Sequence, residues 1–251
     1  MSSHFHTVGY PVGNIDEYWA LARRAAEAGV RNPAADGGAV VRWAVDSGPE
    51  IWSYVSRSGE VTGATPFFST GQSYRIAVTG TGEDPDEELA GWIDGWIEPT
   101  EDDEPFSGAF PLRVDIVNYA LVRQRLTTFP AIHRVELVGL AHEADLYADD
   151  SVYAAAPGDA YHVPLGAIAS GPHFAADADV ETFTEATALL SARLEGARML
   201  TNPHSGQPYW WLELALRGVP LHTFADQETL GGEPAEGKVL AGSFWLLGRL
   251  L

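Results

Sequence analysis

Two segments of this chain resemble each other, and internal similarity favours folds built from related halves. Residues 38–61 align without gaps with residues 196–219. The identical pairs include Gly38/Gly196, Ala39/Ala197, Ser47/Ser205, Gly48/Gly206, Trp52/Trp210 and Val61/Val219. The residues before the two segments are also similar: in both halves a His-Phe pair, at His4 and at His173, precedes a helical pattern. The sequence therefore predicts an internal duplication.

One helix is predicted in each half from apolar residues at three- and four-residue spacing. The first spans residues 14–28, where Asn14 and Glu17 resemble a capping box and Gly29 is the expected stop. The second spans residues 179–195, with Gly196 as its stop. Each helix is expected to have one buried and one solvent-facing side.

Strand patterns surround both helices. They are Val40–Val45, Ile51–Val55, Tyr74–Val78, Trp92–Ile97, Leu112–Leu121, Arg134–Tyr147 and the apolar end of the chain, 241–251. Residues 46–49 and 205–208 are expected to form equivalent hairpin turns, and Asp149 begins a short helix. The predicted fold class is α+β, with two related β-α-β-β-β-like halves whose antiparallel sheets carry helices on one face.

The expected organisation has three segments. Residues 1–98 form the first half, residues 99–170 hold connecting strands and an acidic loop, and residues 171–251 form the second half. The acidic stretch 98–104 is the best linker by composition. A single pseudo-symmetric domain, with one sheet crossing that stretch, is the alternative.

Charge narrows the classes of partner. The chain has 35 acidic and 15 basic residues, a formal net charge of −20. Such a field repels nucleic acid and anionic membranes and attracts cations or basic proteins. Cysteine is absent, so disulfides and thiolate chemistry are excluded. The first residues have no basic and apolar leader, so we expect a cytoplasmic protein.

The common catalytic motifs are absent from the sequence: there is no phosphate-binding loop, dinucleotide fingerprint, nucleophile elbow or zinc-protease helix. The remaining candidates are histidines and carboxylates. His4 and His6 are expected on one face of a first strand, a spacing compatible with a transition metal.

The paired His-Phe positions and the order of the modules resemble the vicinal-oxygen-chelate superfamily. This resemblance implies a divalent metal held by a subset of His4, His6, His173 and Glu98, polarising a substrate oxygen. The second half departs from this pattern, because it has Arg249 near its end and no acidic residue there.

Tryptophan supplies a second kind of candidate site. Trp52 and Trp210 occupy matched positions and are expected in the core. Trp210 and Trp211 are adjacent in a strand and therefore point to opposite faces, so the outer one is a candidate for contacting a ligand or partner.

The apolar tail Gly242–Leu251, together with residues 110–119 and 141–143, resembles an uncharacterised bacterial protein family. That resemblance implies no activity. The favoured hypothesis is a non-enzymatic cytosolic protein that binds a small ligand or a basic partner protein. The alternatives are a divalent-metal enzyme of the vicinal-oxygen-chelate type and an assembly protein that forms a homodimer through a tryptophan-bearing sheet face.

Overall fold

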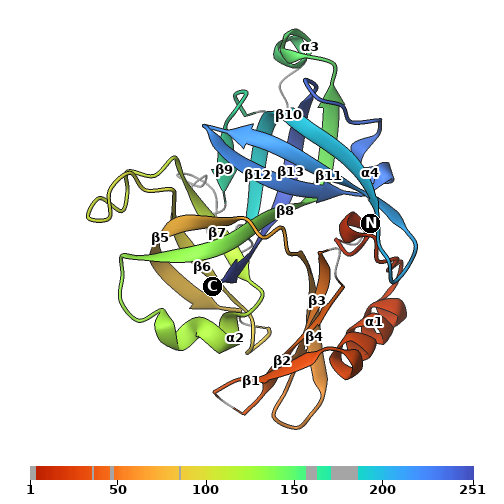
Figure 1. The fold of residues 1–251 in the computed structure, drawn as a ribbon, viewed down its shortest axis with the longest axis vertical. Coiled ribbons are helices and arrows are strands. Elements are labelled where there is room, and N and C mark those ends of the chain that lie inside the picture. Colours follow the sequence, from red (N-terminus) through yellow and green to blue (C-terminus); the bar gives the residue numbers. More distant parts are fainter. Residues whose placement is uncertain (1–3, 36, 46–47, 85, 157–162, 171–185) are drawn as a thin grey trace.

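The computed structural model describes residues 4–35, 37–45, 48–84, 86–156, 163–170 and 186–251. Its N-terminal part is an antiparallel sheet in the order β1-β2-β3-β4 with one long helix on one face (Figure 1). The elements of this part are η1 (His6–Val8), α1 (Ile15–Ala28), β1 (Val30–Pro33), β2 (Ala39–Ala44), β3 (Pro49–Val55) and β4 (Val61–Phe68).

Helix α1 begins and ends as the sequence predicts. The Asn14 side chain accepts a hydrogen bond from the Glu17 amide at 3.0 Å, and the Glu17 carboxylate accepts one from the Gly13 amide. The Gly29 amide closes the last turn on the Ala25 carbonyl. The buried residues Ala22 and Ala25 face the sheet, and their small side chains let the helix lie close to β3.

The rest of the chain is mostly strand. Its elements are β5 (Ser73–Glu83), β6 (Gly91–Ile97), β7 (Phe110–Ile116), α2 (Tyr119–Val122), η2 (Arg123–Arg125), β8 (Ala131–Tyr147), α3 (Asp150–Ala155), β9 (Ile168–Ser170), β10 (Thr187–Thr201), β11 (Pro208–Leu216), β12 (Val219–Ala225), α4 (Gln227–Leu230) and β13 (Val239–Leu250).

Two closed rings of five strands share the long antiparallel pair β8 and β13. The first ring runs β8-β5-β6-β7-β13 and closes because β13 pairs with β8. The second ring runs β13-β10-β11-β12-β8 and closes on the same pair. In Figure 1, β8 and β13 pass side by side through the middle of the molecule, from one ring into the other.

The same pattern of pairings occurs in both rings. Each contains an antiparallel run of three strands, β5-β6-β7 or β10-β11-β12, and the third strand of each run lies parallel to a shared strand. A β-bulge interrupts β5 between Val78 and Gly80, and another interrupts β10 between Leu194 and Gly196. One short helix, α2 or α4, precedes each shared strand.

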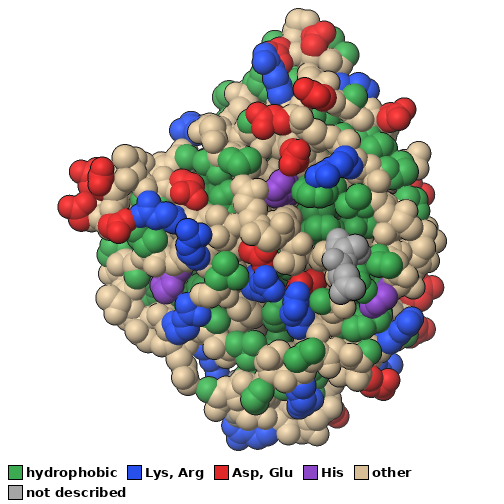
Figure 2. All heavy atoms as spheres, in the orientation of Figure 1, with side chains coloured by type: hydrophobic (Ala, Val, Ile, Leu, Met, Phe, Trp, Pro, Cys, Tyr) green, Lys and Arg blue, Asp and Glu red, His purple; other side chains and the backbone are tan. Residues whose placement is uncertain are grey.

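The chain passes from the N-terminal sheet to the first ring through residues 69–72, and the buried carboxylate of Glu136 holds this crossing. Glu136 of β8 is 2% exposed, forms an ion pair with Arg249, and accepts a hydrogen bond from the Gly71 amide at 2.8 Å. Glu50 is paired with Arg42 and accepts from the Trp52 indole. Figure 2 shows acidic and basic side chains next to each other in the middle of this face.

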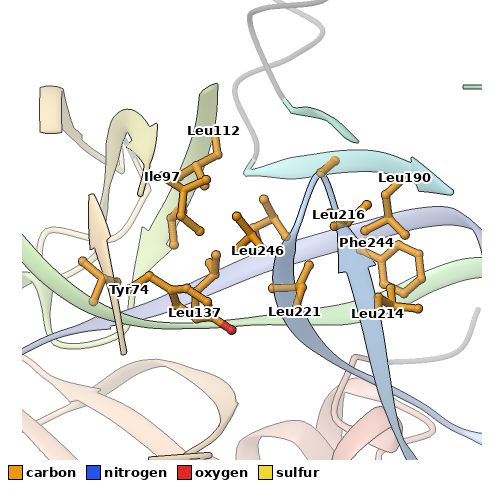
Figure 3. Packing of buried hydrophobic residues seen from close by; sticks show 14 of the residues in the cluster. Tyr74, Ile97, Leu112, Leu137, Leu190, Leu214, Leu216, Leu221, Phe244 and Leu246 are labelled. Carbon is orange, nitrogen blue, oxygen red and sulfur yellow. The ribbon is translucent and has the colours of Figure 1, made fainter. Parts of the chain in front are cut away.

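Two hydrophobic clusters lie on opposite sides of the ring strands. One fills both rings continuously, as the side chains from Tyr74 through Leu246 to Phe244 show in Figure 3. The other lies between the rings and the N-terminal sheet and includes Tyr209, Phe224 and Phe67. The N-terminal sheet is therefore a cover over the outer face of the rings.

The structure is mostly strand with few helices, which is consistent with the predicted α+β class. The N-terminal sheet is antiparallel with a helix on one face, as predicted, whereas the ring sheet is mixed, because β7 and β12 lie parallel to the shared strands. The strands predicted at 40–45, 51–55, 74–78, 92–97 and 134–147 are present, as are the C-terminal strand and the helix capped by Asp149. Both predicted hairpins join antiparallel neighbours, β2 with β3 and β10 with β11.

Three local predictions are wrong. Residues 187–195, expected in a helix, belong to strand β10, since alternate side chains from Ala188 to Leu194 enter the core. The strand predicted over 112–121 ends at Ile116, and α2 follows. His4 and His6 lie in a turn and in η1 rather than in a strand, because Phe5 and Val8 are buried together beneath them. Residues 179–185 of the second predicted helix lie outside the described residues.

The internal duplication predicted from residues 38–61 and 196–219 is not shown. The first segment lies in the N-terminal sheet and the second in the second ring, so their neighbours differ. Strands β6 and β7, which flank residues 98–104, pair with each other. Among the described residues, no helix combines the length and the apolar character needed to cross a bilayer.

Candidate functional site

A cavity of about 350 Å³ lies where the N-terminal sheet meets the first ring. Three regions form it: β3 and β4 with Tyr18 of α1, the loop that follows β5, and the outer face of β6, β7 and β13. Its lining consists of Tyr18, Tyr54, Thr62, Gly63, Ala64, Thr65, Asp84, Asp86, Glu87, Ala90, Gly91, Trp92, Asp115, Ile116, Val117, Trp245 and Leu247.

Four aromatic side chains contribute to the cavity wall, and two of them are tyrosines fixed by hydrogen bonds. The Tyr18 hydroxyl accepts from the Ala64 amide at 2.8 Å, and the Tyr54 hydroxyl lies 3.1 Å from the Thr65 hydroxyl. Burial raises the pKa of both phenols, so both stay neutral. The cavity therefore presents neutral rings rather than phenolates.

Four carboxylates also belong to the lining, whereas Lys, Arg and His are absent from the lining residues that the structure describes. Asp115 accepts a hydrogen bond from the Trp245 indole at 2.7 Å. Glu87 accepts one from the Leu89 amide through Oε1, while its buried Oε2 has no hydrogen-bond partner. Anionic acceptors held next to aromatic faces attract organic cations.

Gly63 of β4 permits this position of Glu87. A Cβ atom at residue 63 would lie 3.1 Å from Glu87 Oε2 and 3.3 Å from the Tyr54 ring. The carboxylate therefore reaches over the edge strand because that strand has no side chain at this point.

Two histidines adjoin the cavity at Trp245. The His4 ring centroid lies 4.9 Å from that of Trp245, and His4 Nε2 is 3.1 Å from His142 Nδ1. Burial, and then the neighbouring His142, lower the pKa of His4 from 6.5 to about 4. His4 is therefore neutral in the folded protein at neutral pH.

This lowered pKa predicts a loss of stability in mild acid. Between pH 6.5 and about 4 the unfolded chain binds a proton at His4 that the folded chain does not bind, so the free energy of unfolding falls as the pH falls through this window. Burial lowers the pKa of His204 and of His222 as well. We expect His4→Phe to reduce the slope, by up to about 1.4 kcal/mol per pH unit. Urea unfolding at several pH values measures it, and parallel curves for the two proteins would contradict it.

The residues predicted as metal ligands are not brought together. His6 Nε2 accepts a hydrogen bond from the Val12 amide, and Glu98 accepts one from the Arg75 amide. Arg75, which contacts Glu98, lies opposite Arg134 of β8, whereas His4 contacts His142, eight residues further along β8. Glu98 and His4 are therefore roughly 25 Å apart along that strand. His173 lies outside the described residues. Within the described ranges, no group of three His, Asp or Glu side chains is arranged to hold a metal ion.

The two adjacent tryptophans do face opposite sides, as predicted. Trp210 is buried in the ring interior, whereas Trp211 packs in the outer cluster. The Trp211 indole donates to His222 Nδ1 at 2.9 Å, and the Arg198 guanidinium lies 3.8 Å from its ring centroid. Trp211 is thus occupied by partners within the chain, and a contact with an external ligand stays a prediction.

Sequence reasoning missed Tyr18, Tyr54 and Asp115. Asp115 carries a readable signal: in β7 the alternating residues Leu112, Val114 and Ile116 are buried, so Asp115 must face outward. A second signal is the Trp-x-acid spacing that Trp92 and Asp94 share with Trp211 and Glu213. The two acids lie opposite the two β-bulges.

In comparisons with known proteins, no protein-family model and no curated protein sequence matches the chain. The geometry of the cavity is therefore the basis on which a function is inferred.

Proposed function

We propose that this protein binds a small organic cation in the cavity between the N-terminal sheet and the first ring. One observation carries the proposal: the described lining combines four carboxylates with four aromatic side chains and includes no basic residue. A volume of about 350 Å³ is at the small end of ligand sites. The net charge of −20 favours approach of a cation from solution.

Glu87 and Asp115 are the expected charge partners of this cation. Glu87 brings a buried oxygen without a hydrogen-bond partner, and Asp115 is oriented by the Trp245 indole. Trp92 and Trp245 also line the cavity, and their aromatic side chains give the alkyl part of such a ligand an apolar wall to pack on. The N-terminal part of the chain is required for binding, because helix α1 provides Tyr18 and strand β3 provides Tyr54.

The test compares n-butylammonium with n-butanol, which has a similar size and no charge, by calorimetric or NMR titration. We expect only the cation to bind, and Glu87→Gln and Asp115→Asn each to weaken it by roughly 10- to 100-fold, since a hydrogen bond to a charged group contributes about 1.5–3 kcal/mol. Asp115→Asn keeps an acceptor for Trp245.

Asp103→Asn is the matched control. It removes the same charge from the exposed connection between β6 and β7, outside the cavity lining, and we expect it to leave binding unchanged. Equal affinity for the cation in all four proteins, or equal binding of the alcohol, would contradict a cation site.

We also propose an internal duplication in a different frame from the one that the sequence alignment favours. Its units are β5 to β8 and β10 to β13. The repeated strand pairings, the matched bulges and the two Trp-x-acid segments support it.

A further inference from the structure

We infer that His4 and His142 together bind a divalent transition-metal ion, through Nε2 of His4 and Nδ1 of His142. This pair differs from the ligand set that the sequence predicts, because His142 takes the place of His6 and Glu98. The site adjoins the cavity at Trp245, and it does not depend on the organic cation proposed above.

The distance between the two ring nitrogens suits a shared metal ion. His4 Nε2 lies 3.1 Å from His142 Nδ1. Imidazole nitrogens lie about 2.0–2.1 Å from a bound Zn²⁺ ion. Two nitrogens on one ion are therefore about 2.9 Å apart when they meet it at a right angle, and about 3.3 Å apart at a tetrahedral angle. The observed separation lies between these values.

The protons of the two rings do not prevent binding. In the absence of a metal, one of the facing nitrogens donates a hydrogen bond to the other. A neutral imidazole can carry its proton on either nitrogen. A metal ion therefore replaces the shared hydrogen when each ring carries its proton on the nitrogen that faces away.

A β-bulge in β8 places His142 at this position. The register of β8 with β13 shifts here, because Ala141 lies opposite Phe244 while Glu143 lies opposite Ser243. Ala141 and Ala144 both enter the ring interior, so the two residues between them lie on the outer side. Both His142 and Glu143 are exposed. The bulge thus turns an imidazole and a carboxylate toward solvent side by side, as bulges near binding sites do.

His4 is held in place from its own side. The next residue, Phe5, is buried, and the Thr7 hydroxyl donates to the His4 carbonyl at 2.6 Å. The His4 ring centroid lies 4.9 Å from that of Trp245, whose indole donates to Asp115. The first ligand is therefore positioned before a metal arrives, which reduces the entropy lost on binding.

The ligand atoms indicate the class of metal. Imidazole nitrogen suits Zn²⁺, Ni²⁺ and Cu²⁺, whereas Ca²⁺ and Mg²⁺ take oxygen ligands. Within the described ranges, no third His, Asp or Glu side chain is placed to join the pair, so water completes the coordination. The net charge of −20 attracts every cation, and the two nitrogens are what favour a transition metal over Ca²⁺.

The test is calorimetric titration of the full chain, without an affinity tag, with Zn²⁺. We expect His4→Phe and His142→Gln each to weaken the tightest Zn²⁺ site by at least tenfold, because loss of a ligand should cost no less than the roughly 10- to 100-fold lost with an outer-shell partner. Phenylalanine keeps a ring against Trp245. In His133→Gln, the matched control, an imidazole is removed from β8 roughly 30 Å away, and we expect unchanged affinity.

A second measurement does not depend on how the variants fold. In ¹⁵N spectra of the histidine rings of the original chain, the first equivalent of Zn²⁺ should shift His4 Nε2 and His142 Nδ1. An excess of Ca²⁺ should leave both signals in place. Shifts confined to other histidines would overturn the inference.

The acidic cavity is the competing place for the ion, and two variants distinguish it. We expect Glu87→Gln and Asp115→Asn to bind Zn²⁺ as the original chain does. Loss of Zn²⁺ affinity in these two, with unchanged affinity in the histidine variants, would place the ion in the cavity and overturn the inference. Lack of Zn²⁺ binding would also overturn it and leave the histidine pair as a hydrogen bond. The proposed function is tested separately, by the titration with n-butylammonium.

Discussion

Replacement of Glu136 by alanine is expected to lower the free energy of unfolding by about 3–5 kcal/mol, the usual loss when one member of a buried ion pair is removed. Glu136 is 2% exposed, and its carboxylate receives the Arg249 guanidinium, the Gly71 amide at 2.8 Å and the Ser69 hydroxyl at 3.2 Å. Alanine leaves these donors without their acceptor in a place where water has little access. Urea unfolding at pH 7 measures the loss.

The matched control for Glu136 is an exposed ion pair. Asp102 pairs with Arg75 and its side chain is 83% exposed, so Asp102→Ala should cost no more than about 1 kcal/mol. A loss in Glu136→Ala as small as that in Asp102→Ala would mean that water replaces the carboxylate at the crossing. Glu136→Gln is expected to lie between the two, because it keeps the shape and an acceptor but removes the charge.

This crossing also decides the geometry of the cavity. Residues 69–72 connect the N-terminal sheet to the first ring, and Glu136 ties two of them to β8. Phe68 precedes this segment and is held on Phe224. The ion pair and the stacked ring together fix how β4 meets the rings, and therefore how far Tyr54 and Gly63 stand from Asp115 and Trp245.

Local signals in the sequence were sufficient for single elements. The Asn14 and Glu17 side chains cap α1 as their spacing indicates, and Asp149 caps α3 through the Ser151 and Val152 amides. Alternation along Arg134–Tyr147 and the apolar tail identified the two shared strands. These features depend on residues that are close together in the sequence, so they can be predicted from one sequence.

The error at residues 187–195 has a physical cause. Leu190 and Leu194 are four residues apart, which suits a helix, and they also alternate with Ser191 and Arg193, which suits a strand. Tertiary pairing decides between these patterns, because β10 gains partners on both sides, in β11 and β13. Neither partner is visible in the local pattern.

The cavity was beyond prediction from sequence for the same reason. Tyr18, Glu87 and Asp115 come from a helix, a loop and a strand that are far apart in the chain. What brings them together is the packing of the N-terminal sheet on the outer face of the rings. The repeated Trp-x-acid spacing does single out Trp92 in the sequence. That the two acids lie opposite β-bulges is known only from the strand register, so the spacing alone does not identify a site.

Replacement of Phe244 by alanine is expected to lower the free energy of unfolding by about 3–5 kcal/mol and to leave a single unfolding transition. Phe244 is fully buried on β13, close to Leu190 and Leu214 in Figure 3. Because β13 is a strand of both rings, a cavity there weakens both rings at once. Urea curves followed by far-UV circular dichroism and by tryptophan fluorescence should therefore coincide, at a lower midpoint.

Phe106→Ala is the control: this side chain is 64% exposed, and we expect a change within about 0.5 kcal/mol. Separate transitions in the two signals would show that the rings unfold independently, and would contradict the coupling of the two rings through β8 and β13.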